Sequence, residues 1–147
     1  MARVVRIALS ALVVSAVIAL GSGCAKQEPV FVDAVTAHTK TTALAVLERA
    51  ESSSMASRPT ADGTELRHDA LAALRRQGAT ASAVADLLTR TFPSDTSGVP
   101  IYVERATYNG KPSVLVVEAT GPESGSLSSK RLWVVAENGD ILLAGSR

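Results

Sequence analysis

The stretch PIYVERATYNGKPSVLVVEA, residues 100–119, decides the fold because it reads as two β-strands joined by a tight turn. β-Branched and aromatic residues dominate both halves, and these residue types favour strands. The pair Asn109-Gly110 separates the halves and is preferred in two-residue type I′ turns. A tight turn of this kind predicts an antiparallel hairpin in which Val103 faces Val116.

A second stretch of the same design, KRLWVVAENGDILLAG, occupies residues 130–145. Asn138-Gly139 again separates two runs that are rich in strand-forming residues. If this turn also has two residues, Val135 faces Leu142. The two hairpins together predict a four-stranded antiparallel sheet.

Helical patterns precede the hairpins. Apolar residues recur at helical spacing in residues 33–51, where Asp33 is suited to the N-cap position, and again in 64–77 and 80–91. Helices followed by antiparallel strands are typical of an α+β domain with one sheet face buried under helices. We therefore expect about three N-terminal helices packed on a four-stranded antiparallel sheet made of two Asn-Gly hairpins.

The N-terminal segment has the organisation of an export signal. Arg3 and Arg6 precede an apolar run, residues 7–20, as in the positive and hydrophobic regions of a signal peptide. As a helix, this run would cover about 21 Å, which is shorter than the roughly 30 Å hydrocarbon core of a bilayer. The length favours a signal over a permanent membrane span.

The end of the apolar run carries a more specific pattern, Gly21-Ser22-Gly23-Cys24. Small residues followed by cysteine resemble the lipobox of bacterial lipoproteins, although Gly21 departs from the aliphatic residue that the family prefers. The resemblance implies cleavage between Gly23 and Cys24 and attachment of a diacylglyceryl group to Cys24. Because two acyl chains hold a protein stably on a bilayer, it also implies a lipid-anchored protein on the extracytoplasmic face of the cell membrane.

This interpretation divides the chain into a cleaved signal peptide at 1–23, a lipidated cysteine with a tether at 24–32, and a single domain at 33–147. Two alternatives remain for Cys24: a free thiol after an ordinary signal, or the end of an uncleaved anchor helix. Since Cys24 is the only cysteine, an intramolecular disulfide is excluded.

The charge of the chain argues against a nucleic-acid partner. Removal of 1–23 takes two of the 15 basic residues, so 13 face 14 acidic residues and the net charge changes from +1 to −1. Residues 72–90 have a weak similarity to a helix-turn-helix motif, but many helical hairpins share it and an exported domain does not meet chromosomal DNA. We expect the membrane, through Cys24, and an envelope protein as partners, and no nucleic acid.

No catalytic, cofactor-binding or metal-binding motif follows the signal. His38 and His68 lie on separate expected helices without further ligands at metal-binding spacing, so both are expected at the surface. Glu104 and Glu118 are expected on opposite faces of the sheet, where they cannot act as a carboxylate pair. We therefore expect no catalytic residues, no cofactor and no metal.

Three hypotheses for function remain at this point. The first is a non-enzymatic accessory or binding module of the cell envelope, with the Gly/Ser-rich loop 121–129, Tyr102 and Tyr108 as contact surfaces. The second is a small-ligand-binding domain with a pocket between helices and sheet. The third is an enzyme whose catalytic residues lie far apart in the sequence and converge on folding.

Overall fold

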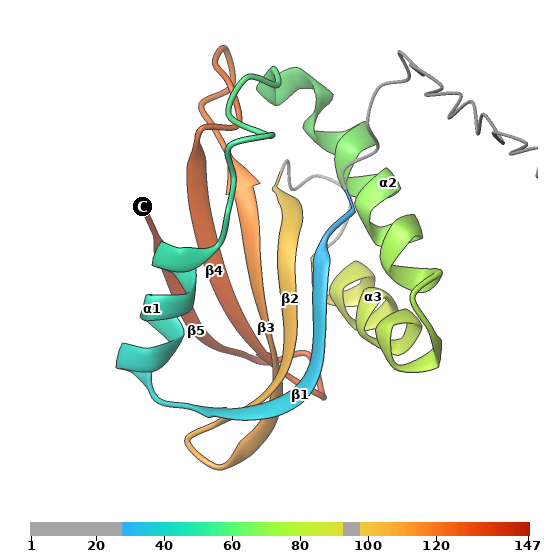
Figure 1. The fold of residues 1–147 in the computed structure, drawn as a ribbon, viewed down its shortest axis with the longest axis vertical. Coiled ribbons are helices and arrows are strands. Elements are labelled where there is room, and N and C mark those ends of the chain that lie inside the picture. The colour runs from blue at the N-terminus through green and yellow to red at the C-terminus, as the bar shows by residue number, and fades with distance from the viewer. Residues whose placement is uncertain (1–27, 93–97) are drawn as a thin grey trace, which may run out of the picture.

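The computed structural model describes residues 28–92 and 98–147, and it contains a five-stranded mixed sheet with helices on both faces (Figure 1). The sheet order is β1-β2-β3-β4-β5. The signal peptide, the lipobox-like residues and Cys24 lie outside the described residues. The elements, in chain order, are β1 (Val30–His38), α1 (Lys40–Arg49), the short 3₁₀-helix η1 (Thr60–Asp62), α2 (Gly63–Arg75), α3 (Ala79–Thr91), β2 (Val99–Tyr108), β3 (Lys111–Thr120), β4 (Ser129–Ala136) and β5 (Ile141–Ser146).

The prediction of a four-stranded antiparallel sheet is wrong, because β1 adds a fifth strand that pairs parallel to β2. The sequence of β1, VFVDAVTAH, is rich in β-branched residues, which lose side-chain freedom in a helix and pack well in a strand. Its apolar residues also fit a helical period, so the pattern alone was ambiguous. The ambiguity is resolved in the folded structure, because the edge of β2 that does not pair with β3 supplies hydrogen-bond partners for the backbone of β1.

Of the helix predicted over 33–51, only residues 40–49 are helical and form α1, because residues 33–38 belong to β1. The backbone N–H of Thr39, at the N-cap position, donates to the Thr42 hydroxyl at 2.9 Å, which stabilises the start of the helix. Asp33 caps nothing and instead accepts a hydrogen bond from Arg105 at 2.8 Å across the β1–β2 pair. At the other end, Lys130 donates to the backbone oxygens of Glu48 and Ala50, so a cation lies at the negative end of the helix.

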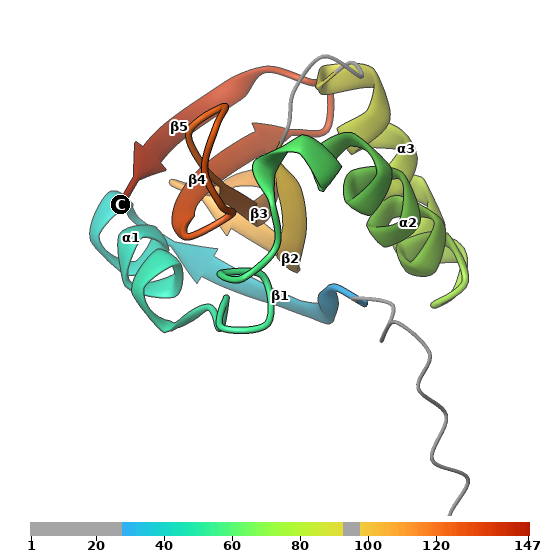
Figure 2. The same cartoon turned by 90° about the horizontal axis from the view of Figure 1, so that it is seen from above.

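Helices cover both faces of the sheet, so the expectation of a single buried face is also wrong. A parallel strand pair needs a long crossover, and the connection from β1 to β2 contains α1, α2 and α3. The sheet curves around α1 on one face, while α2 and α3 pack on the other (Figure 2). Two clusters of buried side chains result: Leu47, Leu115 and Val117 belong to the α1 side, and Leu74 and Val116 to the α2–α3 side.

The first hairpin forms as predicted. Asn109 and Gly110 have φ angles of 48° and 79°, as a type I′ turn requires, and Val103 pairs with Val116. A bulge between Pro100 and Tyr102 lies outside what the turn predicted.

The second hairpin has a longer turn than predicted. The Gly139 N–H donates to the Ala136 oxygen at 2.9 Å, and Gly139 alone adopts a positive φ, of 93°. This geometry shifts the register next to the turn, so Val135 pairs with Ile141 rather than with Leu142, whereas Val134 still pairs with Leu143. Ile141 is consequently half exposed.

The loop between the hairpins is hydrogen-bonded to the segment that precedes η1. Ser126 forms a β-bridge with Pro59, and the Leu127 N–H donates to the Arg58 oxygen at 2.9 Å. Leu127 is fully buried. These contacts connect the loop to the body of the domain over part of its length, and its exposed residues are 122–125 at the tip and Ser128.

Candidate binding groove

A groove runs between α1 and the β1 edge of the sheet. It consists of two adjoining cavities of about 470 and 500 Å³ that share Arg49, and cavities of this size are common among small-ligand sites. We call it the α1–β1 groove. The residues that line it are Val30, Thr36, Ala37, His38, Thr42, Ala45, Val46, Glu48, Arg49, Ala50, Glu51, Ser54, Ile101 and Tyr102.

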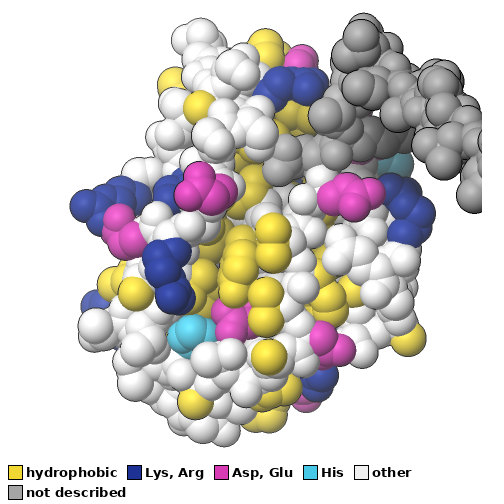
Figure 3. Space-filling view, in the orientation of Figure 1, with side chains coloured by type: hydrophobic (Ala, Val, Ile, Leu, Met, Phe, Trp, Pro, Cys, Tyr) yellow, Lys and Arg dark blue, Asp and Glu magenta, His cyan; other side chains and the backbone are white. Residues whose placement is uncertain are grey.

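The wall of the groove near the start of β1 is largely apolar. Val46, Ala50 and Ile101 are buried beneath it, whereas Val30, at its rim, is 57% exposed. Figure 3 shows hydrophobic side chains gathered between α1 and β1 on this face, with charged side chains beside them. The centre of the α1–sheet interface is filled by buried side chains such as Leu47 and Leu115. The groove therefore lies at the edge of the α1–sheet interface rather than at its centre. On the opposite face of the sheet, a further cavity of about 370 Å³ lies between α3 and the strands β2 and β3.

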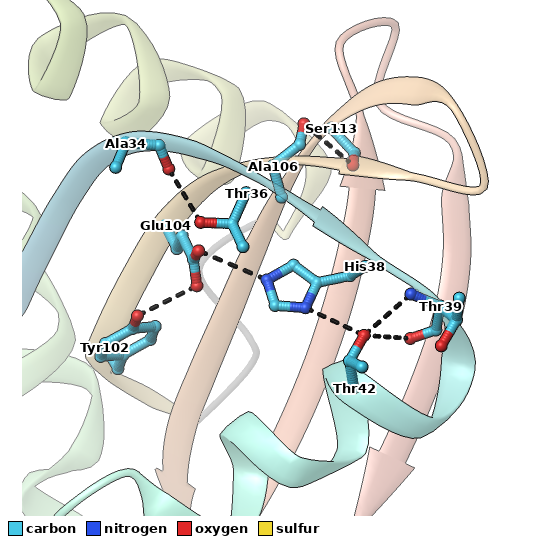
Figure 4. Close-up of polar contacts among 9 residues, drawn as sticks. All are labelled: Ala34, Thr36, His38, Thr39, Thr42, Tyr102, Glu104, Ala106 and Ser113. Carbon is cyan, nitrogen blue, oxygen red and sulfur yellow. Dashed lines mark hydrogen bonds and ion pairs between the residues drawn. The ribbon is translucent and has the colours of Figure 1, made fainter.

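Below the groove lies a buried chain of polar side chains drawn from β1, β2 and α1 (Figure 4). His38 Nε2 and Glu104 Oε1 are 3.3 Å apart, and the Tyr102 hydroxyl donates to Glu104 Oε2 at 3.0 Å. On the other side of the imidazole ring, Nδ1 lies 3.3 Å from the Thr42 hydroxyl. The side chains of His38 and Glu104 are only 6% and 5% exposed, and hydrogen bonds to both carboxylate oxygens offset the cost of burying Glu104.

The Tyr102 phenol responds to this environment. Burial is the largest effect that raises its pKa, and the hydrogen bond to Glu104 and that carboxylate's negative charge raise it further, to about 12. The nearby charge of Arg49 acts in the opposite direction. Tyr102 therefore remains a neutral hydrogen-bond donor over the physiological pH range.

The order hydroxyl–imidazole–carboxylate is shared with nucleophilic catalytic triads, but the Thr42 hydroxyl has other partners here. Its oxygen accepts the Thr39 N–H at 2.9 Å and lies 3.2 Å from the Thr39 carbonyl oxygen, to which it can donate. These bonds stabilise the first turn of α1, and the contact between Thr42 and His38 joins that turn to β1. The arrangement favours a structural role for Thr42 and His38 over a catalytic one.

Two charged side chains line the groove without an ion pair. Arg49 and Glu51 are exposed near the end of α1, and neither forms an ion pair with any of the described residues. By contrast, Glu48, which also lines the groove, is paired with Arg147. Arg49 and Glu51 are thus available to a ligand.

A second buried polar cluster lies on the opposite face of the sheet and connects α2, β3 and β4. Glu118, which is 1% exposed, accepts from Arg67 at 2.6 Å on one oxygen, and from Arg131 at 3.0 Å and Trp133 at 2.9 Å on the other. Arg67 also donates to the Gly98 oxygen at 2.8 Å. The carboxylate has no free side for a substrate, so we assign this cluster to stability.

The structure corrects two expectations about exposed residues. His38 was expected at the surface of a helix but is buried at the end of β1. Tyr108 was expected in a contact surface but packs in the core on the α1 side. His68 is exposed as predicted, with 84% of its side chain accessible. Glu104 and Glu118 lie on opposite faces of the sheet, which confirms that prediction.

Sequence reasoning missed the polar chain beneath the groove and the position of Arg49 in its lining. One signal was present, since Glu104 interrupts an otherwise apolar strand and a carboxylate at such a position needs a partner. The partner, His38, is distant in sequence and was placed on the wrong element.

In residues 28–92 and 98–147, no group of three or more metal-ligating side chains could hold a metal ion. No helix within these ranges is long and apolar enough to cross a bilayer.

No protein-family model matches the chain, and no curated protein or solved structure is significantly similar to it.

Proposed function

We propose that this protein is a membrane-anchored lipoprotein of the extracytoplasmic face whose domain binds a small amphipathic ligand in the α1–β1 groove. The observation that carries the proposal is the groove itself, in which an apolar wall adjoins the guanidinium of Arg49, a side chain that forms no ion pair with the described residues. A ligand with an apolar body and a polar head matches both features. The buried Tyr102–Glu104–His38 chain supports this role, because it joins β1 to β2 and continues through Thr42 to α1 beside the site.

The hypothesis of a protein partner that binds at loop 121–129, Tyr102 and Tyr108 receives less support. Tyr108 is buried, and the loop 121–129 is partly connected to the segment before η1. Tyr102 is half-buried and lines the groove. The residues proposed for protein contact thus form no common exposed surface.

The anchor is tested at the mature N-terminus. We expect the mature chain to begin at Cys24 and to carry acyl mass, because Ser22-Gly23-Cys24 matches the end of a lipobox. Cys24→Ala should remain an uncleaved or mislocalised precursor. Mass spectrometry of the protein purified from membranes provides the measurement, and an intact Met1 on the wild-type chain would refute lipidation.

Ligand binding is tested with an uncharged amphiphile, a fatty alcohol that carries a photoreactive diazirine in its chain. In the full chain reconstituted in phosphatidylcholine vesicles, we expect labelling of residues 30–54 and 101–102. Val30→Asp places a charge on the apolar rim of the groove, and should lower labelling there about fivefold, as the loss of about 1 kcal/mol of apolar contact implies. Peptide mass spectrometry locates and quantifies the label.

Val35→Asp is the matched control. Val35 lies on the same strand and is 54% exposed, close to the 57% of Val30, but it does not line the groove. It should leave labelling unchanged. Equal labelling of the wild type and Val30→Asp would show that the groove does not bind the probe and would overturn the proposed binding function.

A further inference from the structure

The charges and the position of the groove indicate what kind of amphiphile it takes. We propose that the α1–β1 groove binds a phosphoethanolamine head group of a membrane phospholipid, with an acyl chain along its apolar wall. Arg49 contacts the phosphate and Glu51 contacts the ammonium group. This inference rests on the proposed function and specifies its ligand.

The paired charges match a zwitterion better than an anion. A guanidinium group binds phosphate oxygens through two parallel hydrogen bonds, and Arg49 forms no ion pair with the described residues that would compete. Glu51 lines the same cavity and would repel a purely anionic head group. An ammonium group satisfies Glu51, whereas the trimethylated nitrogen of a choline head group has no N–H to donate to it.

The carboxylates near this site differ in whether they are free to contact an ammonium group. Glu104 accepts one hydrogen bond from Tyr102 on Oε2, and its Oε1 lies 3.3 Å from His38 Nε2, so both of its oxygens are engaged below the groove. Glu48 is engaged with Arg147. Among the carboxylates that line the groove, Glu51 is therefore the one available to an ammonium group.

The position of the groove in the chain indicates the source of the lipid. Val30 lies at the groove rim and is the first residue of β1, six positions after Cys24 (30 − 24). Six residues span at most about 20 Å when fully extended. With the lipid on Cys24 in the bilayer, the groove is held close to the head groups of the same membrane, so a phospholipid of that membrane is the amphiphile at highest local concentration.

The test compares lysophospholipids that share one diazirine-bearing acyl chain and differ in the head group. In the full chain in phosphatidylcholine vesicles, we expect the ethanolamine lipid to label the groove about fivefold more than the glycerol or choline lipid, the factor that an exposed ion pair supplies. Glu51→Gln should abolish this preference. Arg49→Gln should lower labelling by all three phospholipids, and by a larger factor than labelling by the uncharged alcohol, which has no phosphate for the guanidinium to bind.

Arg76→Gln and Glu123→Gln are the matched controls, because both residues are exposed and lie outside the groove. Neither should alter the head-group preference. Equal labelling by the three phospholipids, or a preference for the glycerol lipid, would overturn this inference while labelling by the alcohol still supports the groove. Failure of the alcohol itself to label the groove would overturn the proposed function as well.

Discussion

Replacing Arg67 by alanine is expected to lower the free energy of unfolding by about 3–5 kcal/mol, the usual cost of removing one partner from a buried ion pair. The Arg67 and Glu118 side chains are only 5% and 1% exposed, and their charged atoms are 2.6 Å apart. Without Arg67, one oxygen of Glu118 and the Gly98 carbonyl lose their donor. Urea unfolding of the full chain in a non-ionic detergent, followed by circular dichroism, measures the change.

Arg75→Ala is the control for this prediction. Arg75 lies on the same helix and pairs with Asp86 at 3.0 Å, but the two side chains are 38% and 52% exposed. Solvent screens such a pair, and we expect a loss of about 0.5 kcal/mol. If the two variants unfold at the same urea concentration, the Glu118 cluster does not stabilise the fold as the buried geometry indicates.

Replacing Gly121 by alanine is expected to cost about 3 kcal/mol, at the upper end of overpacking effects. A Cβ at this position would overlap the backbone oxygen of Ser126 and come within 2.6 Å of the Thr60 hydroxyl oxygen. The Ser126 oxygen cannot move freely, since it accepts the Ser128 N–H at 2.8 Å and Ser126 is bridged to Pro59. The same unfolding measurement applies.

Ser124→Ala provides the comparison within the same loop. Ser124 is exposed at the loop tip, and substitutions at such surface positions usually change stability by less than about 0.5 kcal/mol. A Gly121→Ala protein as stable as Ser124→Ala would mean that the loop is free to move away from Pro59 and Thr60. The whole segment 121–129 would then again be a candidate for a mobile contact surface.

The hairpins show how far local sequence determines structure. Asn109-Gly110 specified both the turn and the register of β2 and β3, because a type I′ turn leaves little freedom to the residues that flank it. Asn138-Gly139 is the same dipeptide, yet it forms a longer turn in which only Gly139 has a positive φ. The dipeptide therefore predicts that a hairpin forms, and its surroundings select the turn type.

The error at β1 has a different origin. Residues 33–38 carry apolar residues whose spacing fits both a strand and a helix, so periodicity could not separate the two. A parallel partner for this segment lies about 70 residues away, as in the pairing of Val32 with Glu104. No local pattern reports such a contact. For this reason the prediction of a four-stranded antiparallel sheet with helices on one face was wrong.

The candidate site depends on the same long-range pairing. Because β1 pairs with β2, His38 comes within 3.3 Å of Glu104 and Val30 comes beside the cavity under α1. With the helix expected from sequence, His38 would lie at the surface and the groove would not exist. The residues of the site were visible in the sequence, but their proximity was not.

Taken by itself, the sequence determined the features that depend on near neighbours: the first hairpin and its register, the helices α2 and α3 within a few residues, and a lipobox-like pattern that predicts attachment through Cys24. Only the tertiary structure decided the strand β1, the helices on both faces of the sheet and the α1–β1 groove. Each of these depends on backbone pairing or burial between residues far apart in the chain. The free energy of these contacts is gained only once the fold has brought the residues together.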